Sequence, residues 1–287
     1  MEKGGYSNNL IELPFSKIFF RLAVPNLFST IIASATTIFD LWYVGQIGIP
    51  ELAGVAYIFP IYMLASMLSN GAFGGAVSGA TARAFGSKNI FKAECIFRSA
   101  ILIALVGALL MMTLFFGLAQ TLFSSLSIDQ EITTSALTYG RILLGGIVLI
   151  WLFNIVIAIT RGSGNTLIPA ISWLIVLIFH ILAASINFEY KDGELILLEN
   201  VKIFSDFFIF NSLEWSAISF LLGYLAGIFF VFIFYYLGKH PFSFNVKNIF
   251  RIDGIKALLK SGSLASCQSI MTIILAMFCI VIISTYG

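Results

Sequence analysis

The chain has 287 residues, of which 59% are hydrophobic and only 10% are charged, whereas soluble globular proteins carry about 25% charged residues, so a membrane protein is indicated. Sixteen Lys and Arg residues against fourteen Asp and Glu residues leave a net charge of +2, which excludes the basic surface that nucleic-acid binding requires. The three cysteines form no C-x-x-C pair, so neither a disulfide framework nor a thiolate metal site is indicated.

Seven stretches without a charged residue divide the chain. They lie between Arg21 and Asp40 and at 52–82, 99–128, 142–160, 162–188, 215–238 and 261–287. Each is long enough to cross a hydrocarbon core of about 30 Å as an α-helix, and continuous apolar runs argue against a β-barrel. The sequence therefore predicts an all-α, polytopic (multi-pass) membrane protein whose direct partner is the lipid bilayer. No basic n-region with a cleavage site precedes the first span, so we expect no cleaved signal peptide.

Lys and Arg residues predict the orientation, because they accumulate on the cytoplasmic side of a membrane. The N-terminal segment and the connections after the second, fourth and sixth spans hold 3, 4, 1 and 5 of them, and the other connections hold three in all. We therefore expect the N-terminus on the cytoplasmic side of the plasma (inner) membrane.

Residues 189–214 form the longest connection on the expected outer side. They carry six acidic residues and two lysines, and the apolar residues between the charges show no clear period. This pattern favours a solvated loop.

Asp40 is the acidic residue closest to the interior of an apolar helix. A carboxyl group in such a place can hold a proton or a cation as its surroundings change. The alternative is an ordinary interface aspartate, because Asp40 lies about 27 Å along a helix that begins near Leu22. The neighbouring Trp42 and Tyr43 suit an outer aromatic belt and support that alternative.

His180 lies in the middle of the fifth span. A neutral imidazole that is hydrogen-bonded between helices and a proton-carrying site are equally compatible with this position. Four asparagines in the spans, Asn26, Asn70, Asn154 and Asn187, are candidates either for the lining of a polar cavity or for interhelical hydrogen bonds.

Gly71, Gly75 and Gly79 recur every four residues in the second span, and Arg83 stands one step further along. Such spacing removes the side chains from one helix face, so that a neighbouring backbone can approach closely. We predict helix packing for this stripe, with a gating role in a protein that changes conformation.

The sequence also lacks the motifs of several enzymes. There is no G-x-x-x-x-G-K-[ST] motif, no H-E-x-x-H motif and no Cys/His ligand spacing, so neither direct use of ATP nor a metal site is indicated. An intramembrane protease built on Ser78 and His180 is disfavoured, because residue 76 is Ala and the expected glycine is missing. A seven-helix receptor is disfavoured by the cytoplasmic N-terminus. We expect no enzyme, no catalytic residue and no cofactor.

A series of short motifs follows in a fixed order along residues 15–187. They are Arg21–Pro25, Asp40 with Val44–Gly45, Glu51–Ala56 with Pro60, Gly71–Gly86, Tyr139–Ile142 and Arg161–Thr166 with Pro169. Together they resemble the first lobe of the multidrug and toxic compound extrusion (MATE) family. The resemblance implies a secondary transporter of two six-helix lobes that exchanges H⁺ or Na⁺ for a bulky, often cationic compound.

The same resemblance implies which residues couple transport to an ion. Asp40 matches the acidic residue of the family's first helix, and Tyr139 matches a tyrosine near the cation site. Members often carry Asn-x-x-x-Asp on the fifth helix, and these two places here hold His180 and Ala184. Without the second carboxylate, His180 is expected to serve as a proton carrier, or coupling is altered or lost.

The resemblance also divides the chain. Residues 1–20 are predicted as a cytoplasmic amphipathic segment, 21–238 as a six-helix N-lobe, 239–260 as a cytoplasmic interlobe linker, and 261–287 as the first helix of an incomplete C-lobe. A separate chain that supplies the missing lobe is left open as a partner.

The leading hypothesis is an antiporter for multidrug efflux, that is, for the transport of xenobiotic small molecules. The alternatives are a lipid-linked oligosaccharide flippase of the same superfamily and a truncated remnant that inserts but does not transport. The sequence predicts neither the substrate nor the choice between H⁺ and Na⁺.

Overall fold

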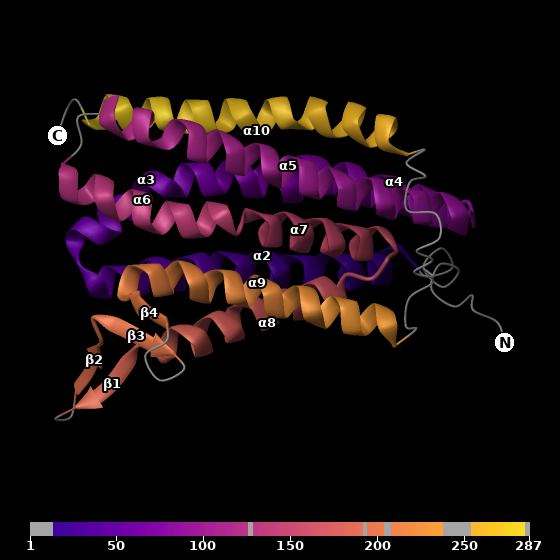
Figure 1. Cartoon of the computed structure of the whole chain (residues 1–287). Helices are drawn as coiled ribbons and strands as arrows, with labels where there is room; N and C mark the ends of the chain where they lie inside the picture. The colour runs from indigo at the N-terminus through magenta and orange to yellow at the C-terminus, as the bar shows by residue number, and fades with distance from the viewer. Residues whose placement is uncertain (1–13, 126–128, 192–193, 204–207, 238–253, 285–287) are drawn as a thin grey trace.

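The computed structural model describes residues 14–125, 129–191, 194–203, 208–237 and 254–284. Its helices are α2 (Phe15–Ile47), α3 (Ile49–Ser66), the π-helix η1 (Met67–Phe73), α4 (Gly74–Gly86), α5 (Ile90–Ser125), α6 (Gln130–Gly145), α7 (Ile147–Gly162), α8 (Leu167–Ser185), α9 (Ser212–Tyr236) and α10 (Ile255–Ser284). They lie side by side in one bundle (Figure 1). The predicted all-α membrane fold is confirmed.

Several helices of the bundle have the length and composition of membrane spans. Six helical segments of the described chain are long and apolar enough to span a bilayer, and α6 and α7, bent by 46° relative to each other, meet the same criteria when taken together. The segment Ile49–Gly86 combines α3, η1 and α4 in one span. The seven spans predicted from the sequence correspond to these segments.

The bend between α6 and α7 has a local cause in the sequence. Gly145 and Gly146 form a pair that favours a break in a helix. Leu221 of α9 occupies the space that a Cβ atom of Gly146 would need. The glycine therefore allows α9 to approach the chain at the point where it bends.

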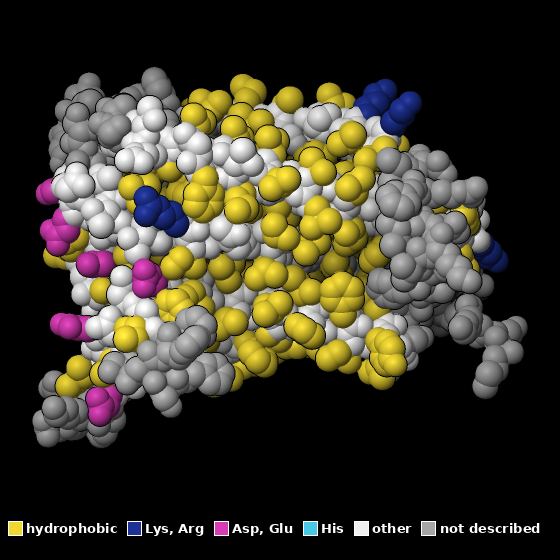
Figure 2. Space-filling view, viewed as in Figure 1, with side chains coloured by type: hydrophobic (Ala, Val, Ile, Leu, Met, Phe, Trp, Pro, Cys, Tyr) yellow, Lys and Arg dark blue, Asp and Glu magenta, His cyan; other side chains and the backbone are white. Residues whose placement is uncertain are grey.

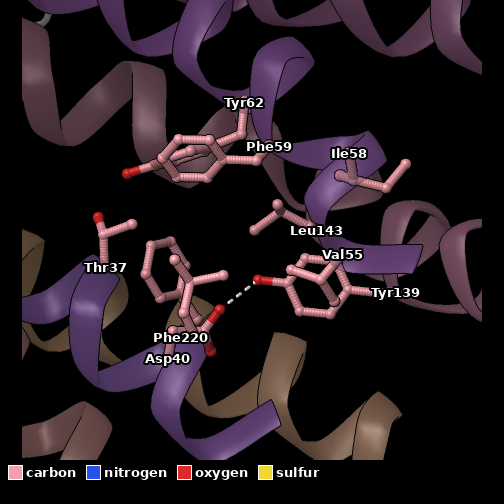
Figure 3. A pocket seen from close by; sticks show the side chains of 10 residues that line it. Thr37, Asp40, Val55, Ile58, Phe59, Tyr62, Tyr139, Leu143 and Phe220 are labelled. Atoms are coloured by element: carbon pink, nitrogen blue, oxygen red, sulfur yellow. Dashed lines mark hydrogen bonds between the residues drawn. The ribbon is translucent and has the colours of Figure 1, made fainter. Parts of the chain in front are cut away.

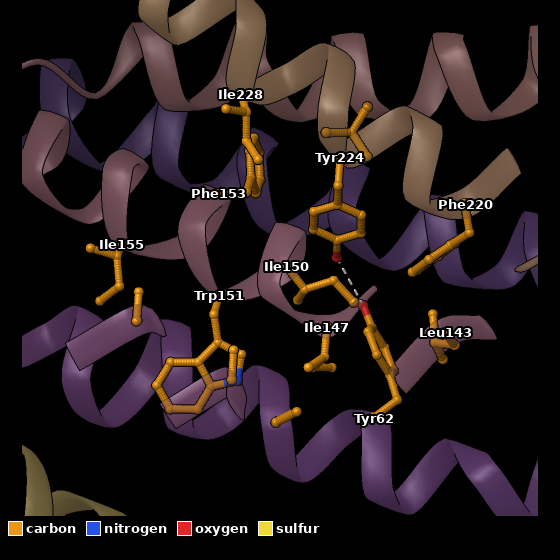
Figure 4. Close-up of a cluster of buried hydrophobic side chains, with 14 of the residues drawn as sticks. Tyr62, Leu143, Ile147, Ile150, Trp151, Phe153, Ile155, Phe220, Tyr224 and Ile228 are labelled. Atoms are coloured by element: carbon orange, nitrogen blue, oxygen red, sulfur yellow. Dashed lines mark hydrogen bonds between the residues drawn. The ribbon is translucent and has the colours of Figure 1, made fainter. Parts of the chain in front are cut away.

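Helix α7 is the centre of the bundle. It is apolar around its whole circumference, as expected for a helix surrounded by others, and α4, α5, α9 and η1 all pack against it. Trp151, Phe153 and Ile150 of α7 are almost completely buried, and Figure 4 shows them beside Tyr62 and Tyr224.

Figures 1 and 2 show that the two ends of the bundle differ. Helices α2 and α10 begin at the same end and run toward the end that holds the four strands (Figure 1). Hydrophobic side chains cover the middle of the face shown in Figure 2, and its Asp and Glu side chains gather at the strand end. This distribution suits a protein that spans a bilayer with unlike ends.

The predicted solvated loop at 189–214 is wrong in part, because two antiparallel hairpins lie there. Strands β1 (Phe188–Lys191) and β2 (Glu194–Leu197) form one, and β3 (Asn200–Ile203) and β4 (Phe208–Asn211) form the other. The sequence carried the signals: polar and apolar residues alternate in β1 and β3, and an Asp-Gly pair separates β1 from β2.

Two predicted boundaries shift in the structure. Residues 15–20, assigned to the N-terminal segment, already belong to α2, and residues 255–260, assigned to the interlobe linker, already belong to α10. Both helices extend past the charged residues that marked the expected ends, because lysine and arginine side chains can reach the membrane surface from a helix that continues. Residues 1–13 and 238–253 lie outside the described residues.

The predicted close packing at the glycine stripe is not found in the described part of the chain. A Cβ atom added to Gly71 or Gly75 would meet no atom within 4 Å, and one added to Gly79 would meet only Arg83 Nη1, at 3.4 Å. The glycine that packs here is Gly74, against the carbonyl oxygen of Ser69. The stripe belongs to an open face of the bundle.

Candidate functional site

Asp40 lies on the strand-end half of α2 and is almost completely buried, with 3% of its surface exposed. Its Oδ2 accepts a hydrogen bond of 2.6 Å from the Tyr139 hydroxyl of α6 (Figure 3). Its Oδ1 accepts one of 2.7 Å from the Ser216 hydroxyl of α9. The carboxyl group is therefore held between helices, with little of it exposed at the surface of the bundle.

His180 of α8 completes this cluster. Its Nε2 lies 3.5 Å from Asp40 Oδ1, and its Nδ1 lies 3.1 Å from the Ser219 hydroxyl oxygen. The rings of Phe39 and Phe220 pack edge-on against the imidazole. The imidazole is thus fixed in a position that faces the carboxyl group.

A small cavity adjoins Asp40 and Tyr139. It has a volume of about 10 Å³, roughly the space for the centre of one water molecule. Apolar side chains such as Val55, Ile58 and Leu143 form most of its wall. We call Asp40, Tyr139, His180, Ser216 and Ser219 the carboxyl cluster. The cavity beside this cluster has room for about one water molecule.

A second and larger cavity lies toward the other end of α2. It has a volume of about 180 Å³, and α2, α3, η1, α7 and α8 contribute to its lining. Its polar lining residues are Asn26, Ser29, Thr30, Ser34, Thr37, Tyr62, Ser66, Asn70 and Arg161. We call it the arginine cavity, after the only lysine or arginine that lines it in the described part of the chain.

The four asparagines singled out in the sequence serve both predicted purposes. Asn26 and Asn70 line the arginine cavity. Asn154 donates to the Ser69 hydroxyl at 2.8 Å, and Asn187 donates to the Tyr43 hydroxyl at 2.6 Å. Two asparagines therefore line a cavity, and two join neighbouring helices.

The structure thus brings Asp40, Tyr139 and His180 together, while the glycine stripe and Arg83 lie elsewhere. Arg83 is exposed in the last turn of α4, where a positive charge interacts favourably with the helix dipole. Gating by this stripe stays a prediction.

Sequence reasoning missed the two serines of the carboxyl cluster. Ser216 and Ser219 stand on the α9 face that continues to Gly223 and Gly227. A Cβ atom at Gly223 would lie 2.6 Å from the Val176 carbonyl oxygen, so α8 and α9 are in close contact there. The repeat of small residues in α9 was the signal for this contact.

Comparisons with known proteins agree with this architecture. The family model named MatE matches residues 25–186, more than half of the chain. The chain belongs to the MatE family. MatE proteins are transporters, and the multi-pass membrane fold described above is theirs.

Solved structures show the same fold. A MATE transporter in the bent conformation superposes with a TM-score of 0.78 at 20% sequence identity, over 94% of this chain and 56% of that one. A MOP superfamily transporter from Pyrococcus furiosus, with reverse polarity of its binding pocket, gives a TM-score of 0.77 at 20% identity, over 96% of this chain and 57% of that one.

One curated relative of this MatE chain is an FAD transporter from Shewanella oneidensis. It is 23% identical over 163 residues, which is 57% of this chain and 36% of the relative. The chain thus spans little more than half the length of the MATE transporters of known structure, and about a third of this relative is matched.

Proposed function

We propose that this MatE chain is part of a secondary active transporter, an antiporter that exports small organic molecules in exchange for protons. The observation that carries the proposal is the contact between Asp40 and His180. A carboxyl group that faces an imidazole in a nearly dry cluster can take up and release a proton.

The Ser219 hydroxyl lies between two partners, the Ser216 carbonyl oxygen at 2.8 Å and His180 Nδ1 at 3.1 Å. When it donates to Ser216, its oxygen accepts from His180 Nδ1–H, and when it donates to Nδ1, the neutral imidazole carries its proton on Nε2. In either arrangement a single proton between Nε2 and Asp40 Oδ1, which lie 3.5 Å apart, makes this contact favourable.

The same cluster supports H⁺ over Na⁺. Sodium is a hard cation that binds several oxygen ligands, whereas a ring nitrogen stands on one side of Asp40 and hydroxyl donors occupy both carboxyl oxygens. The proton is therefore the coupling ion that we propose.

Release of this proton alters the contacts that join four helices. A charged carboxylate strengthens the hydrogen bonds from Tyr139 and Ser216, and a neutral carboxyl group weakens them. Each protonation state thus favours its own packing of α2 against α6, α8 and α9, and the transported molecule shifts the same equilibrium by its differential affinity.

The orientation and the cargo complete the proposal. Lys17, Arg21 and Lys256 stand at the end where α2 and α10 begin, which supports a cytoplasmic N-terminus in the plasma membrane. Drug-like, often cationic compounds are the first cargo class. A flavin nucleotide is the second, favoured by the relative that is an FAD transporter. A second lobe, in the same or a separate chain, would close the transport pathway.

The test compares Asp40→Asn with the control Glu131→Gln. Glu131 is exposed in the first turn of α6, at the same end of the bundle. We expect D40N to abolish proton-driven uptake of a fluorescent cationic dye into everted vesicles, which corresponds to export from the cell, and the control to retain it, at equal membrane insertion.

Infrared difference spectroscopy tests the proton itself on the purified chain. A pH step is expected to produce a carboxyl C=O band that D40N removes and that shifts in His180→Gln. Unchanged uptake in D40N, or a spectrum identical in D40N and the wild type, would refute the coupling role of Asp40.

A further inference from the structure

The arginine cavity holds a positive charge without a negative one. Arg161 lines it near the end of α7, and no Asp or Glu contributes to its lining. The side-chain partner of its guanidinium is Asn70, whose Oδ1 accepts from Nη2 at 2.6 Å. In the part of the chain that the structure describes, no ion pair includes Arg161.

Asn70 adds hydrogen-bond donors to those of Arg161. Its amide oxygen faces Arg161, so its two amide N–H bonds remain for other acceptors. Arg161 likewise has five N–H donors, of which the bond to Asn70 uses one. The two side chains together present several donors and a full positive charge at the cavity wall.

The remaining polar lining is neutral. It comes largely from one face of α2, with Asn26, Thr30 and Ser34 exposed along it. The hydroxyls of Ser29, Thr30 and Thr37 each donate to a carbonyl oxygen one turn earlier in the helix, so they remain as acceptors at the cavity wall. A hydroxyl- and amide-lined cavity with one guanidinium suits a polar, negatively charged group.

A helix face of this kind does not belong against lipid. Polar side chains at membrane depth face a cavity or another part of the protein. A volume of about 180 Å³ holds several water molecules, so a small charged group fits without rearrangement of the core.

We infer that Arg161 and Asn70 form a binding subsite for an oxyanion, a carboxylate or phosphate group on the transported molecule. The guanidinium fork matches both groups in geometry. The inference rests on the proposed transport function, because it assigns the cavity to cargo, and it adds that the cargo carries a negative group as well as an aromatic or apolar part. Met63, in the same lining and partly exposed, offers an apolar surface for that part.

The test uses two fluorescent probes that differ by one phosphate, riboflavin and riboflavin 5′-phosphate. Fluorescence anisotropy measures their binding to the purified chain in a maltoside detergent without phospholipid. We expect the phosphate ester to bind at least about tenfold more tightly than riboflavin, because the phosphate gains charge-assisted hydrogen bonds. Equal binding of the two probes by the wild type would overturn the inference.

Three variants assign the preference to the subsite. Arg161→Gln is expected to remove it, and Arg161→Lys to keep part of it, since lysine retains the charge and loses the fork. Asn70→Asp leaves the arginine in place but pairs it with a carboxylate, so the preference should again be lost. Arg141→Gln, at an exposed residue of α6 toward the opposite end of the bundle, is the control and should retain it.

Two further arms separate the cargo from other sources of phosphate. Inorganic phosphate should compete with riboflavin 5′-phosphate in the wild type but not in Arg161→Gln. A short-chain phosphatidylglycerol that competes at lower concentration than inorganic phosphate would reassign the subsite to a lipid headgroup and overturn the assignment to cargo. Retention of the preference in Arg161→Gln, with normal folding, would also overturn it.

The preference for riboflavin 5′-phosphate over riboflavin tests the subsite separately from proton coupling. Asp40→Asn should still bind riboflavin 5′-phosphate more tightly than riboflavin, whatever its effect on overall affinity, because Asp40 does not line the arginine cavity and the preference depends on Arg161. If D40N transports normally while the phosphate preference depends on Arg161, the coupling proposal fails and the subsite stands. If D40N stops transport while Arg161→Gln keeps the preference, the subsite fails alone.

Discussion

Two polar regions lie along α2, and they differ in whether protein side chains or open cavity space surround their polar atoms. In the carboxyl cluster, side chains from α6, α8 and α9 surround Asp40, and the adjoining cavity measures about 10 Å³. In the arginine cavity, about 180 Å³ is open beside Arg161, and part of the lining is exposed. The first region is closely packed around one carboxyl group, and the second has room for a molecule.

The two regions share part of a wall. Thr37 and Tyr62 line both cavities, and Figure 3 shows Tyr62 across the small cavity from Asp40, with Thr37 on the same helix as Asp40. A change in the packing of α2 against α3 would therefore affect both regions together. In the proposed transport cycle, this shared wall would carry a change at Asp40 to a molecule beside Arg161.

Accessibility to water-soluble reagents should show the largest difference between the regions. In a chain whose native cysteines are replaced, Ser34→Cys is expected to react with a charged thiol reagent on the order of 100-fold faster than Ser216→Cys, because reaction of a buried group requires a local opening that costs several kcal/mol. Ser34 is exposed, and Ser216 is completely buried. Comparable labelling rates would contradict the sealed state of the carboxyl cluster.

The sequence predicted the carboxyl cluster better than it predicted the arginine cavity. Charge-free stretches and the Lys and Arg distribution were enough for the seven spans, because long apolar segments have few alternatives in a bilayer. Asp40 and His180 stood out because ionisable groups are rare within spans, and Tyr139 stood out through the resemblance to the MATE family. Arg161 was noted only as part of a motif, because its lack of an acidic partner depends on how four helices meet.

Glycine spacing shows the limit of such patterns most clearly. Gly71 and Gly75 repeat every four residues, and Gly223 and Gly227 do the same. The first pair has no neighbour within 4 Å of an added Cβ atom, whereas the second pair lies in close contact with α8 and Phe153. Spacing reveals a bare helix face, but the tertiary packing decides whether another helix covers it.

A matched pair of alanine variants tests this contrast and the sealing of the carboxyl cluster. Gly223→Ala places a methyl group 2.6 Å from the Val176 carbonyl oxygen and 3.3 Å from His180 Cβ, so it should lower the free energy of unfolding by about 1–3 kcal/mol. Gly75→Ala meets no atom within 4 Å and should be neutral or stabilising by up to about 1 kcal/mol, since alanine favours helix.

Thermal unfolding of both variants in detergent measures the difference. Gly223→Ala should also speed the labelling of Ser216→Cys, because it separates α8 from α9 beside the carboxyl cluster. Equal melting temperatures for the two alanine variants would show that α8 and α9 are not held by this contact.

The smallest expected effect concerns the wall between the regions. The hydroxyls of Tyr62 and Tyr224 form a buried hydrogen bond of 3.0 Å (Figure 4). Tyr62→Phe leaves the Tyr224 hydroxyl without this partner at a completely buried place, whereas Tyr224→Phe leaves the Tyr62 hydroxyl beside the arginine cavity, where water can replace the lost bond.

Tyr62→Phe should therefore cost about 1 kcal/mol more than Tyr224→Phe, because an unsatisfied buried hydroxyl carries the full desolvation penalty. Chemical unfolding of the two variants under identical conditions measures this difference. Equal costs would mean that water reaches both hydroxyls. Tyr62 would then not separate the buried interior around Tyr224 from the arginine cavity.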